Sequence, residues 1–483
     1  MKKIFIVPFA LLVITTLLFN ACKKSVETIY ISPAVIHAAN PINDTTTGGT
    51  LAGTMLSGHT YNISRDITVN KGDTLWLQEG VTVCLHGTPT IIIKGALISL
   101  GTQASPNWFT RCSLSKTNTI AQSENPITDS AFIGCWTGIN CDTSCTLLVL
   151  KWTHIEWAGA AFPVTENFVG GTQGKKSYAI LFQNPSGDFV LEDSWIYGST
   201  DDAIRVQSGR LSIMRNTFEK CGSTGGDCVN LKSGSVGDLA YNLYIGTATN
   251  GSKASNKGGI NPQCNINIYN NTYVDGGYRQ NQTGRGANVN YEQGARGLSY
   301  NNLIVNCKFG FRIVGNPTYA DTLNLDYGYN FGYGDSASIT NQLIPVGYVT
   351  KNNTYIIPSA AILNQIPVIY DPVNGTAAYN AASLAGQNNP QFVNFPLPEI
   401  GISHLFDINY VSPGTIAPLT NNPAGSYDFH LQVTSPAIGI GYTNFNALNM
   451  ISAGVKATFY APIVTPPCAD MGCYPLLGNG NQH

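Results

Sequence analysis

The stretch Ile268-Tyr269-Asn270-Asn271-Thr272-Tyr273 places a polar pair that ends in Asn directly before a short apolar strand. Similar segments recur along the chain: Val190-Leu-Glu-Asp-Ser-Trp-Ile196, Ile213-Met-Arg-Asn-Thr-Phe218, Leu298-Ser-Tyr-Asn-Asn-Leu-Ile304 and Val349-Thr-Lys-Asn-Asn-Thr-Tyr-Ile356. The intervals from Asn216 to Asn271, Asn302 and Asn353 are 55, 31 and 51 residues. These intervals correspond to one or two coils of about 22–30 residues, within the range of repeats that stack as solenoids.

Asn has two physical uses at such a position. It tolerates the left-handed backbone of a sharp corner. Its side-chain amide can also hydrogen-bond to the equivalent amide one coil above, which forms a ladder. Asn-rich surface loops are the alternative interpretation, but they do not explain why an apolar strand follows each copy.

Residues 60–110 contain very short strands separated by glycines, such as Leu75-Trp76-Leu77 and Val81-Thr82-Val83. Strands of about three to five residues cannot cover the face of a sandwich, but they can form the sides of stacked coils. Alternate side chains then point into the coil. The sequence therefore predicts an all-β protein, a single-stranded right-handed parallel β-helix (a solenoid) with long loops and a C-terminal cap.

Composition limits the functions that are compatible with this fold. The chain has 483 residues, 50 glycines, 11% charged residues and a net charge of −2. So little charge argues against a disordered protein, and near-neutrality removes any electrostatic case for nucleic-acid binding.

The N-terminus has the pattern of an export signal. Met1-Lys2-Lys3 precedes an apolar run, residues 4–19, and Asn20-Ala21-Cys22 follows. This run is too short and wrongly flanked for a membrane-spanning helix. A Cys after a small residue resembles a lipobox, in which the Cys is acylated; the alternative is a plain signal peptide. We expect lipidation of Cys22 and anchoring in the outer membrane, facing the periplasm or the exterior.

Export implies an oxidising destination, where the twelve cysteines can form disulfides. Three pairs are close enough to join locally, although spacing does not fix connectivity: Cys141/Cys145, Cys221/Cys228 and Cys468/Cys473. Three others lie in apolar strand patterns and are expected to be small buried thiols: Cys84, Cys264 and Cys307. No zinc site is expected, because the seven His are scattered and no pair of CxxC elements occurs.

Asn270-Asn-Thr-Tyr273 and Tyr300-Asn-Asn-Leu-Ile304 resemble the turn-and-strand repeat of right-handed parallel β-helix proteins, a superfamily that includes pectate lyases and other polysaccharide lyases. Three later segments resemble the closing part of such proteins: Asn389-Pro-Gln-Phe-Val-Asn394, Asp428-Phe-His-Leu431 and Ser435-Pro-Ala-Ile-Gly439. The resemblance spans about residues 60–475. It implies the fold but not the function, because one fold hosts unrelated activities.

The pattern predicts four parts: a signal peptide at 1–21, a lipidated Cys and tether at 22–54, the β-helix at 55–360, and an irregular C-terminal segment at 361–483. We expect that segment to pack on the helix and cap it, because an open terminal coil exposes strand edges and apolar interior. The chain is expected to act as a monomer that touches the membrane only through its lipid.

Aligning the coils on their closing glycines stacks residues 201–209, 226–234, 286–294 and 309–315. Asp202 then lies over Asp227, and strand alternation puts the polar columns on the outside. The resulting columns are Arg205, Asn230, Asn290 and Arg312, and beside them Gln207, Lys232 and Glu292.

Such a face matches the needs of a lyase that acts on an acidic sugar. Asp202 and Asp227 are the candidate ligands of a Ca²⁺ ion held against a substrate uronate. Lys232, Arg205 and Arg312 are the candidate base and charge stabilisers. The alternative is a polar ladder that pairs with itself and keeps the face soluble.

Two insertions, residues 247–263 and 275–285, predict loops that build a binding cleft. Tyr278, Arg279 and Arg285, beside Glu292, would offer an aromatic platform with cations for sugar rings and their acidic groups. The alternative is a solvated loop whose arginines pair locally.

Two functions therefore remain open. The first is an enzyme, a polysaccharide lyase or a glycoside hydrolase that acts on an acidic polysaccharide. The second is a non-catalytic envelope protein that binds glycans or partners. They differ in whether Asp202, Asp227, Lys232 and Arg312 converge within a few ångströms in an open groove.

Overall fold

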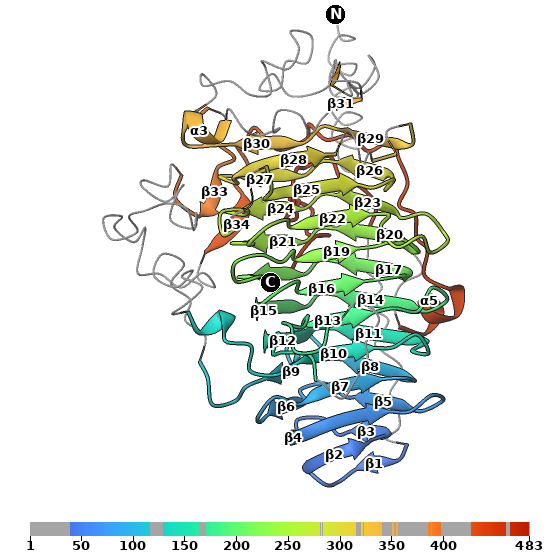
Figure 1. Ribbon diagram of the computed structural model, residues 1–483. Helices are drawn as coiled ribbons and strands as arrows, with labels where there is room; N and C mark the ends of the chain where they lie inside the picture. The colour runs from blue at the N-terminus through green and yellow to red at the C-terminus, as the bar shows by residue number, and fades with distance from the viewer. Residues whose placement is uncertain are drawn as a thin grey trace, which may run out of the picture.

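The computed structural model describes residues 39–115, 129–163, 171–280, 282, 284–314, 320–321, 323–340, 350–351, 354–355, 385–387, 389–397, 427–459 and 464–482. Within these residues the chain is a right-handed parallel β-helix, which confirms the predicted fold class (Figure 1). Successive strands go round the coil and stack into three parallel ladders, named ladder 1, ladder 2 and ladder 3 below.

Ladder 1 is a separate eleven-stranded sheet. Its strands are β1 (Pro41–Ile42), β3 (Gly53–Met55), β5 (Thr74–Leu77), β8 (Ala96–Leu100), β11 (Leu147–Lys151), β14 (Asp188–Glu192), β17 (Gly209–Met214), β20 (Ser235–Ala240), β23 (Asn265–Tyr269), β26 (Gly297–Tyr300) and β29 (Leu325–Gly328).

Ladder 2 follows ladder 1 in each coil. Its strands are β6 (Thr82–Leu85), β9 (Asn107–Thr110), β12 (Thr153–Ala158), β15 (Trp195–Ser199), β18 (Thr217–Glu219), β21 (Leu243–Ile245), β24 (Thr272–Val274), β27 (Leu303–Val305) and β30 (Phe331–Tyr333). The ten-residue β4 pairs with both β6 and β7, so ladders 2 and 3 belong to one sheet.

Ladder 3 completes each coil. Its strands are β2 (Thr46–Thr50), β4 (Thr60–Val69), β7 (Thr90–Ile93), β10 (Gly138–Cys141), β13 (Ile180–Phe182), β16 (Ile204–Val206), β19 (Val229–Leu231), β22 (Ser252–Ser255), β25 (Ala287–Glu292) and β28 (Phe309–Ile313). The remaining elements are η1 (Ser130–Phe132), α3 (Ala337–Thr340), β31 (Thr350–Lys351), β32 (Thr354–Tyr355), β33 (Phe392–Asn394), β34 (Asp428–Leu431) and α5 (Ala453–Phe459).

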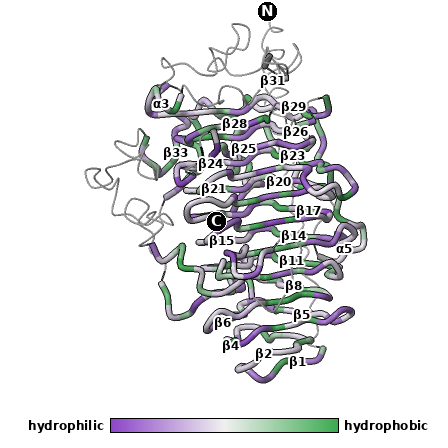
Figure 2. The backbone as a smooth tube through the Cα atoms, viewed as in Figure 1, coloured by the Kyte–Doolittle hydropathy of each residue, from purple (hydrophilic) through white to green (hydrophobic). Residues whose placement is uncertain are grey.

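The interior is filled by inward side chains that stack in register from coil to coil. Ile180, Ile204 and Val229 pair directly along ladder 3 and are fully buried. Figure 2 shows hydrophobic and hydrophilic residues alternating along the coils, as expected where every second side chain faces inward. Burial of this continuous apolar column is the main favourable contribution to folding.

The predicted Asn ladder runs through the corner between ladders 1 and 2. Asn271 Oδ1 accepts from the backbone N and Nδ2 of Asn242 at 2.9 and 3.0 Å, and Asn271 Nδ2 donates to Asn302 Oδ1 at 3.0 Å. Asn216 and Asn330 extend the ladder at either end by the same pattern. Asn242 and Asn330 were not among the aligned copies, because Tyr rather than a polar residue precedes each of them.

The left-handed corner lies one residue before the ladder position. Asn270 and Asn301 have φ values of 50° and 60°, and Arg215, Tyr241 and Tyr329 occupy the equivalent place with similar values. The left-handed corner and the amide ladder, which were expected of one Asn, therefore belong to two adjacent residues. The first residue of each pair turns the chain, and the second directs its amide into the ladder.

The boundaries of the coils differ from the predicted 55–360. Strand β1 begins at Pro41, and β2 pairs with β4, because the Thr-rich stretch read as a tether is able to form a strand. At the other end, β31 and β32 pair antiparallel with each other. The copy expected at residues 349–356 therefore does not supply a parallel coil strand. The signal peptide and Cys22 lie outside the described residues.

The C-terminal residues 427–459 and 464–482, named the strap here, run along the side of the stack. Asn301 Nδ2 donates to the Tyr442 carbonyl at 2.8 Å, and Asp238 accepts the backbone N–H groups of Leu448 and Asn449 at 2.9 and 2.7 Å. The expectation of an end cap is corrected for this part, because the corner residues offer polar partners along the side. Figure 1 shows α5 beside ladder 1 and the C-terminus near β15.

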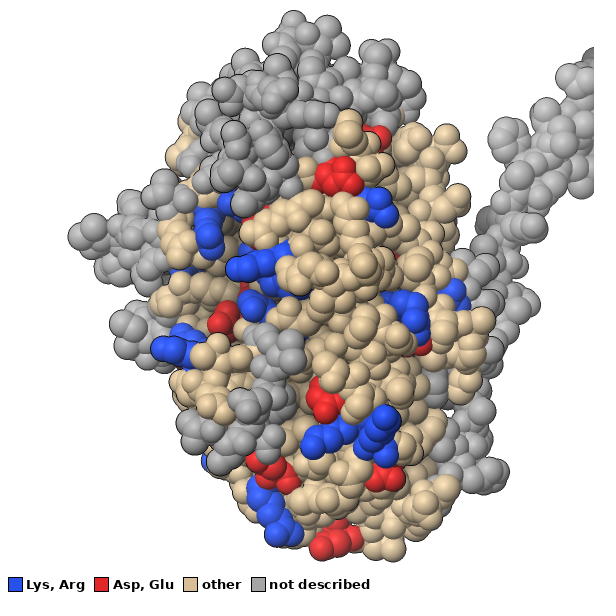
Figure 3. Space-filling model, turned by 45° about the vertical axis from the view of Figure 1, so that its right-hand side comes forward, with Lys and Arg blue, Asp and Glu red and all other residues tan. Residues whose placement is uncertain are grey.

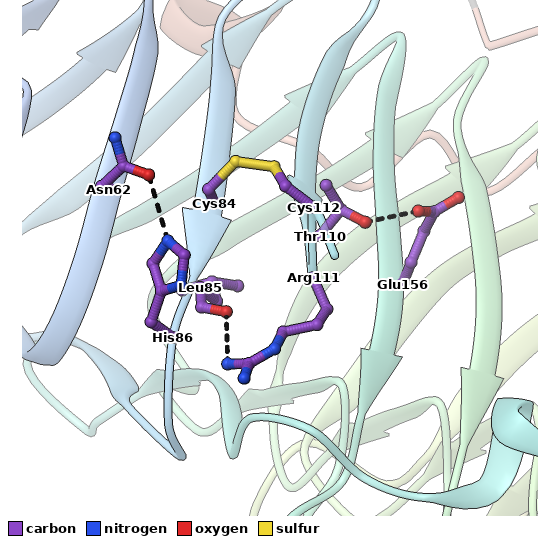
Figure 4. The surroundings of a disulfide bond; sticks show 8 residues. All are labelled: Asn62, Cys84, Leu85, His86, Thr110, Arg111, Cys112 and Glu156. Atoms are coloured by element: carbon purple, nitrogen blue, oxygen red, sulfur yellow. Dashed lines mark hydrogen bonds between the residues drawn. A yellow bond between two sulfur atoms is a disulfide. The ribbon is translucent and has the colours of Figure 1, made fainter. Parts of the chain in front are cut away.

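Cys84 forms a disulfide with Cys112 (Figure 4), so its prediction as a buried free thiol is wrong. Val83 and Leu85 fill the core on either side, and alternation therefore turns Cys84 outward. Cys264 and Cys307 are buried thiols, as predicted. In the described part of the chain, no helix has both the length and the apolar character needed to cross a membrane.

The ladder predicts a specific cost for its central member. Asn271→Ala is expected to lower the free energy of unfolding by about 3 kcal/mol, because buried groups of Asn242 and Asn302 lose their partners. Chemical denaturation of the full chain measures this change. Asn324→Ala, which removes exposed bonds to Asp321, is the control and should change stability by less than about 0.5 kcal/mol. Equal effects would contradict a stabilising role for the ladder.

Candidate functional site

The outward side of ladder 3 between β16 and β28 carries a column of polar residues, named the polar face here. The register aligns Arg205, Asn230, Lys253, Asn290 and Arg312 on successive strands. The sequence alignment found this column except for Lys253, which lies on β22 within residues that were interpreted as a loop insertion. Figure 3 shows Lys and Arg interspersed with Asp and Glu on the molecular surface, without one dominant sign.

Asp202 accepts three hydrogen bonds at the β16 end of the polar face, which is called its lower end below. Its Oδ2 accepts from Arg205 Nε at 2.7 Å and from Asn230 Nδ2 at 2.9 Å. Its Oδ1 accepts the backbone N–H of Asp227 at 2.7 Å. Asp202 and Asp227 are therefore neighbours, as the alignment placed them, and Asp202 fixes the loop that carries Asp227.

A series of side chains of alternating charge connects this lower end of the polar face to its upper end at β28. Lys253 Nζ lies 3.7 Å from Asp227 Oδ2 and 3.3 Å from Glu292 Oε1. Arg312 Nη1 lies 3.1 Å from Glu292 Oε2 and 2.9 Å from Asn290 Oδ1. The side chains of these ion pairs are between 7 and 14% exposed, so the charges are only slightly solvated.

Lys232 lies among these charges but, unlike Arg205, Lys253 and Arg312, is in no ion pair within the described residues. It is 8% exposed, and within the described residues no carboxylate lies within 4 Å of its ammonium group. Burial, together with repulsion from Lys253 and Arg205, lowers the pKa of Lys232 to about 8. A buried amine with such a pKa is able to act as a base near neutral pH.

Three buried polar atoms of β19, of β22 and of the turn before β22 have no hydrogen-bond partner among the residues that the structure describes. They are Asn230 Oδ1, Asn250 Oδ1 and Ser255 Oγ. Their residues are at most 3% exposed. Buried polar atoms are almost always paired, so water or a ligand group is the expected partner at each of these atoms.

Tyr178 and Asp201 border the polar face and were not selected from the sequence. The guanidinium of Arg205 lies 4.4 Å from the ring centre of Tyr178, a cation–π contact. Burial and the neighbouring Asp202 carboxylate raise the pKa of Asp201 to about 7. Asp201 can therefore exchange a proton near neutral pH. The doublet Asp201-Asp202 was the available sequence signal.

Two of the four residues expected to form a sugar platform are buried. Tyr278 is buried and donates to the Asn306 carbonyl at 2.9 Å. Arg279 is 1% exposed and donates to backbone carbonyls that include those of Gly222 and Gly246, each at 2.8 Å. The expected open platform is corrected at these two positions, because both side chains hold the loops together. Arg285 is exposed, and Glu292 belongs to the polar face.

The polar face is a poor fit for Ca²⁺. Both oxygens of Asp202 already accept hydrogen bonds, including one from the cation Arg205. Asp227 faces Lys253 and accepts from Asn250 Nδ2 at 2.6 Å. In the described part of the chain, no group of three or more His, Cys, Asp or Glu side chains could hold a metal ion. Ca²⁺ takes six to eight oxygen ligands, which these already bonded carboxylates do not provide.

The chain was also compared with known proteins. No protein-family model matches it, and no match is found among curated proteins or among solved structures. The likeness to β-helix proteins therefore rests on the fold alone.

The ion pairs of Glu292 predict a pH-dependent contribution to stability. Burial alone would raise the pKa of Glu292, but Lys253 and Arg312 lower it to about 2. A lowered pKa in the folded state stabilises the protein above the unfolded pKa of about 4.5. Glu292→Gln should cost about 2–3 kcal/mol at pH 7, and the cost should decline as the pH falls from about 4.5 to 2. Denaturation at several pH values tests this, and a pH-independent difference would contradict it.

The poor match between the polar face and Ca²⁺ predicts that the chain does not depend on divalent cations. Removing divalent cations with a chelator should leave the thermal unfolding midpoint and glycan binding of the full chain unchanged, because its own cations occupy the carboxylates. A midpoint that falls on chelation and recovers with Ca²⁺, but not with Mg²⁺, would contradict this geometry.

Proposed function

We propose that the polar face is a glycan site and that the chain cleaves an acidic polysaccharide by β-elimination, with Lys232 as the base. The observation that carries this proposal is the position of Lys232, a buried amine with a lowered pKa that directly follows β19, the strand of Asn230, whose buried Oδ1 has no partner among the described residues. The fold adds an analogy with polysaccharide lyases, which is weaker support.

The reaction requires three contributions from this chain. Neutral Lys232 would take the proton next to the uronate carboxylate, the bond to the glycosidic oxygen would break, and that oxygen would gain a proton. Lys253 and the two arginines of the column would stabilise the negative charge that develops on the carboxylate. Asp201, with a pKa of about 7, is able to supply the proton to the leaving oxygen.

Localisation belongs to the same proposal. The N-terminal pattern favours export and lipidation at Cys22, and the Cys84–Cys112 disulfide is typical of proteins in oxidising compartments. A surface or periplasmic lipoprotein would meet polysaccharides directly. No other partner follows from the described residues.

The rate should depend on the protonation of Lys232. Because the base is the neutral amine, kcat/KM is expected to rise with pH through about 8 and then to level off. Lys232→Ala should reduce turnover by at least about 100-fold, within the range found when a general base is removed. The assay follows absorbance of the unsaturated uronate with polygalacturonate, alginate and a neutral glucan as substrates.

Lys257→Ala is the matched control, because Lys257 is an exposed lysine on the adjacent loop. Its turnover should equal that of the unchanged chain. Equal activity of the two lysine variants would contradict the role of Lys232. Binding without turnover on every substrate would favour a non-catalytic glycan-binding protein.

Hydrolysis is the second candidate, and Asp201 is the observation that favours it. A carboxylic acid with a raised pKa beside a second carboxyl group, that of Asp202, is the arrangement that glycoside hydrolases use. New reducing ends without unsaturated product would identify this chemistry. Asp201→Asn would then abolish activity, whereas Lys232→Ala would retain a measurable part of it.

A further inference from the structure

Lys220 and Asp129 form an ion pair that is completely shielded from solvent. Lys220 Nζ lies 3.1 Å from Asp129 Oδ2, and both side chains are 0% exposed. In every other ion pair between described residues, at least one side chain is 13% exposed or more. Removing two charges from water is costly, and their mutual attraction often fails to offset that cost. A covalent, uncharged link at this position would remove it.

Aromatic side chains surround the pair on the outer side of ladder 2. Asp129 directly precedes η1, and Phe132 of η1 packs in one buried cluster with Trp157 and Tyr197. Lys220 directly follows β18, and its Nζ lies 5.7 Å from the centre of the Tyr197 ring. Exclusion of water from such a site protects the product of a condensation from hydrolysis.

We propose that Lys220 and Asp129 become joined by an intramolecular amide (isopeptide) bond, with Glu219 as the proton carrier. The amine and the carboxyl group are already in contact, and the fold alone brings together these residues, which are 91 positions apart. This modification site does not depend on the proposed function, because it lies on ladder 2 and the polar face lies on ladder 3.

The carboxyl group of Asp129 is oriented for attack by the amine. Its Oδ1 accepts the backbone N–H of Ala131 at 2.9 Å, and its Oδ2 faces Lys220. Attack on the carboxyl carbon moves negative charge onto Oδ1, where the N–H of Ala131 stabilises it. Oδ2 is then the oxygen that leaves as water.

Glu219 lies on the same outer side of ladder 2 as the pair. Phe218 points into the core, so alternation along β18 turns Glu219 outward. Glu219 is 1% exposed and pairs in register with Tyr197, whose ring is next to Lys220 Nζ. A carboxylate in this position is able to move a proton from the attacking nitrogen to the leaving oxygen.

The reaction is a condensation and needs no oxidant. One proton passes from the Lys220 ammonium to Asp129 Oδ2, which leaves an amine and a carboxylic acid. The nitrogen attacks the carboxyl carbon, a C–N bond forms, and Glu219 takes a proton from the nitrogen. Glu219 then gives that proton to the hydroxyl group at Oδ2, the C–O bond breaks, and one water molecule leaves. A neutral amide replaces two buried charges.

The amide bond would be the second covalent link between the stack and the connection from β9 to β10. Cys112, just after β9, is joined to Cys84 on β6, whereas Asp129, before β10, meets Lys220 after β18. β6 and β18 are four strands apart in ladder 2, which is about 19 Å at the usual spacing of neighbouring strands. The two links would therefore hold both sides of this connection to well-separated coils.

Peptide mapping of the full chain tests the proposal. The folded chain is reduced, alkylated and digested with trypsin in denaturant, and the peptides are sequenced by tandem mass spectrometry. The expected product is one branched peptide that contains Asp129 and Lys220 and is lighter than its two components by one water molecule. Cleavage after Lys220 should be lost, because trypsin does not cleave after an acylated lysine. Linear peptides alone, with complete cleavage after Lys220, would overturn the proposal.

The ion pair of Lys253 and Glu292 is the internal control. Its atoms lie 3.3 Å apart, but its side chains are 13 and 14% exposed, so it should yield only linear peptides. A branched peptide from this pair as well would overturn the requirement for a site without water.

Two variants test the roles of the residues. Lys220→Arg keeps the positive charge without a lysine amine, and the branched peptide should disappear. Glu219→Gln should slow formation of the bond in newly synthesised chain by at least about 100-fold. Linkage of this variant at the unchanged rate would overturn the role of Glu219. The map of the unchanged chain decides whether the bond exists even if a variant does not fold.

Discussion

Amide-to-amide hydrogen bonding along the helix axis is the constraint on which this structure depends. Where the chain turns from ladder 1 to ladder 2, its backbone groups are buried and need partners. The inward Asn residues supply them, and each also donates to the Asn of the next coil. The coils are thereby held in one register. The outward columns, including the polar face, are aligned because this inner ladder is aligned.

The parts of the structure that repeat could be predicted from the sequence. The Asn pairs gave the stacking direction, and the glycines that close each coil placed Asp202 over Asp227 and Arg205 in one column with Arg312. These inferences work because coil stacking converts spacing along the chain into neighbourhood in space. The sequence alignment missed Lys253, because a long loop in its coil changes the spacing between repeats, and the strand of Lys253 was interpreted as part of that loop.

What could not be predicted depends on contacts between distant segments. Tyr278 and Arg279 looked like surface residues of a polar loop, but both are buried. Carbonyls of other coils bind the Arg279 guanidinium, and the Asn306 carbonyl binds the Tyr278 hydroxyl. Cys84 looked like a core residue because its neighbours are apolar, and only alternation along β6 turns it outward. The path of the strap had no local signal, because its partners are side chains of residues about 200 positions earlier.

The strap has a consequence for the accuracy of assembly. Its residues Thr465, Asp470 and Cys468 accept hydrogen bonds from Arg215, Asn270 and Asn301, respectively, which come from separate coils. The distance between these contacts is set by the covalent length of the strap, whereas the distance between the corners is set by how the coils have stacked. A slip of one coil would make the two lengths disagree. The strap, which follows the coils in the chain, therefore fits only a stack in which no coil has slipped.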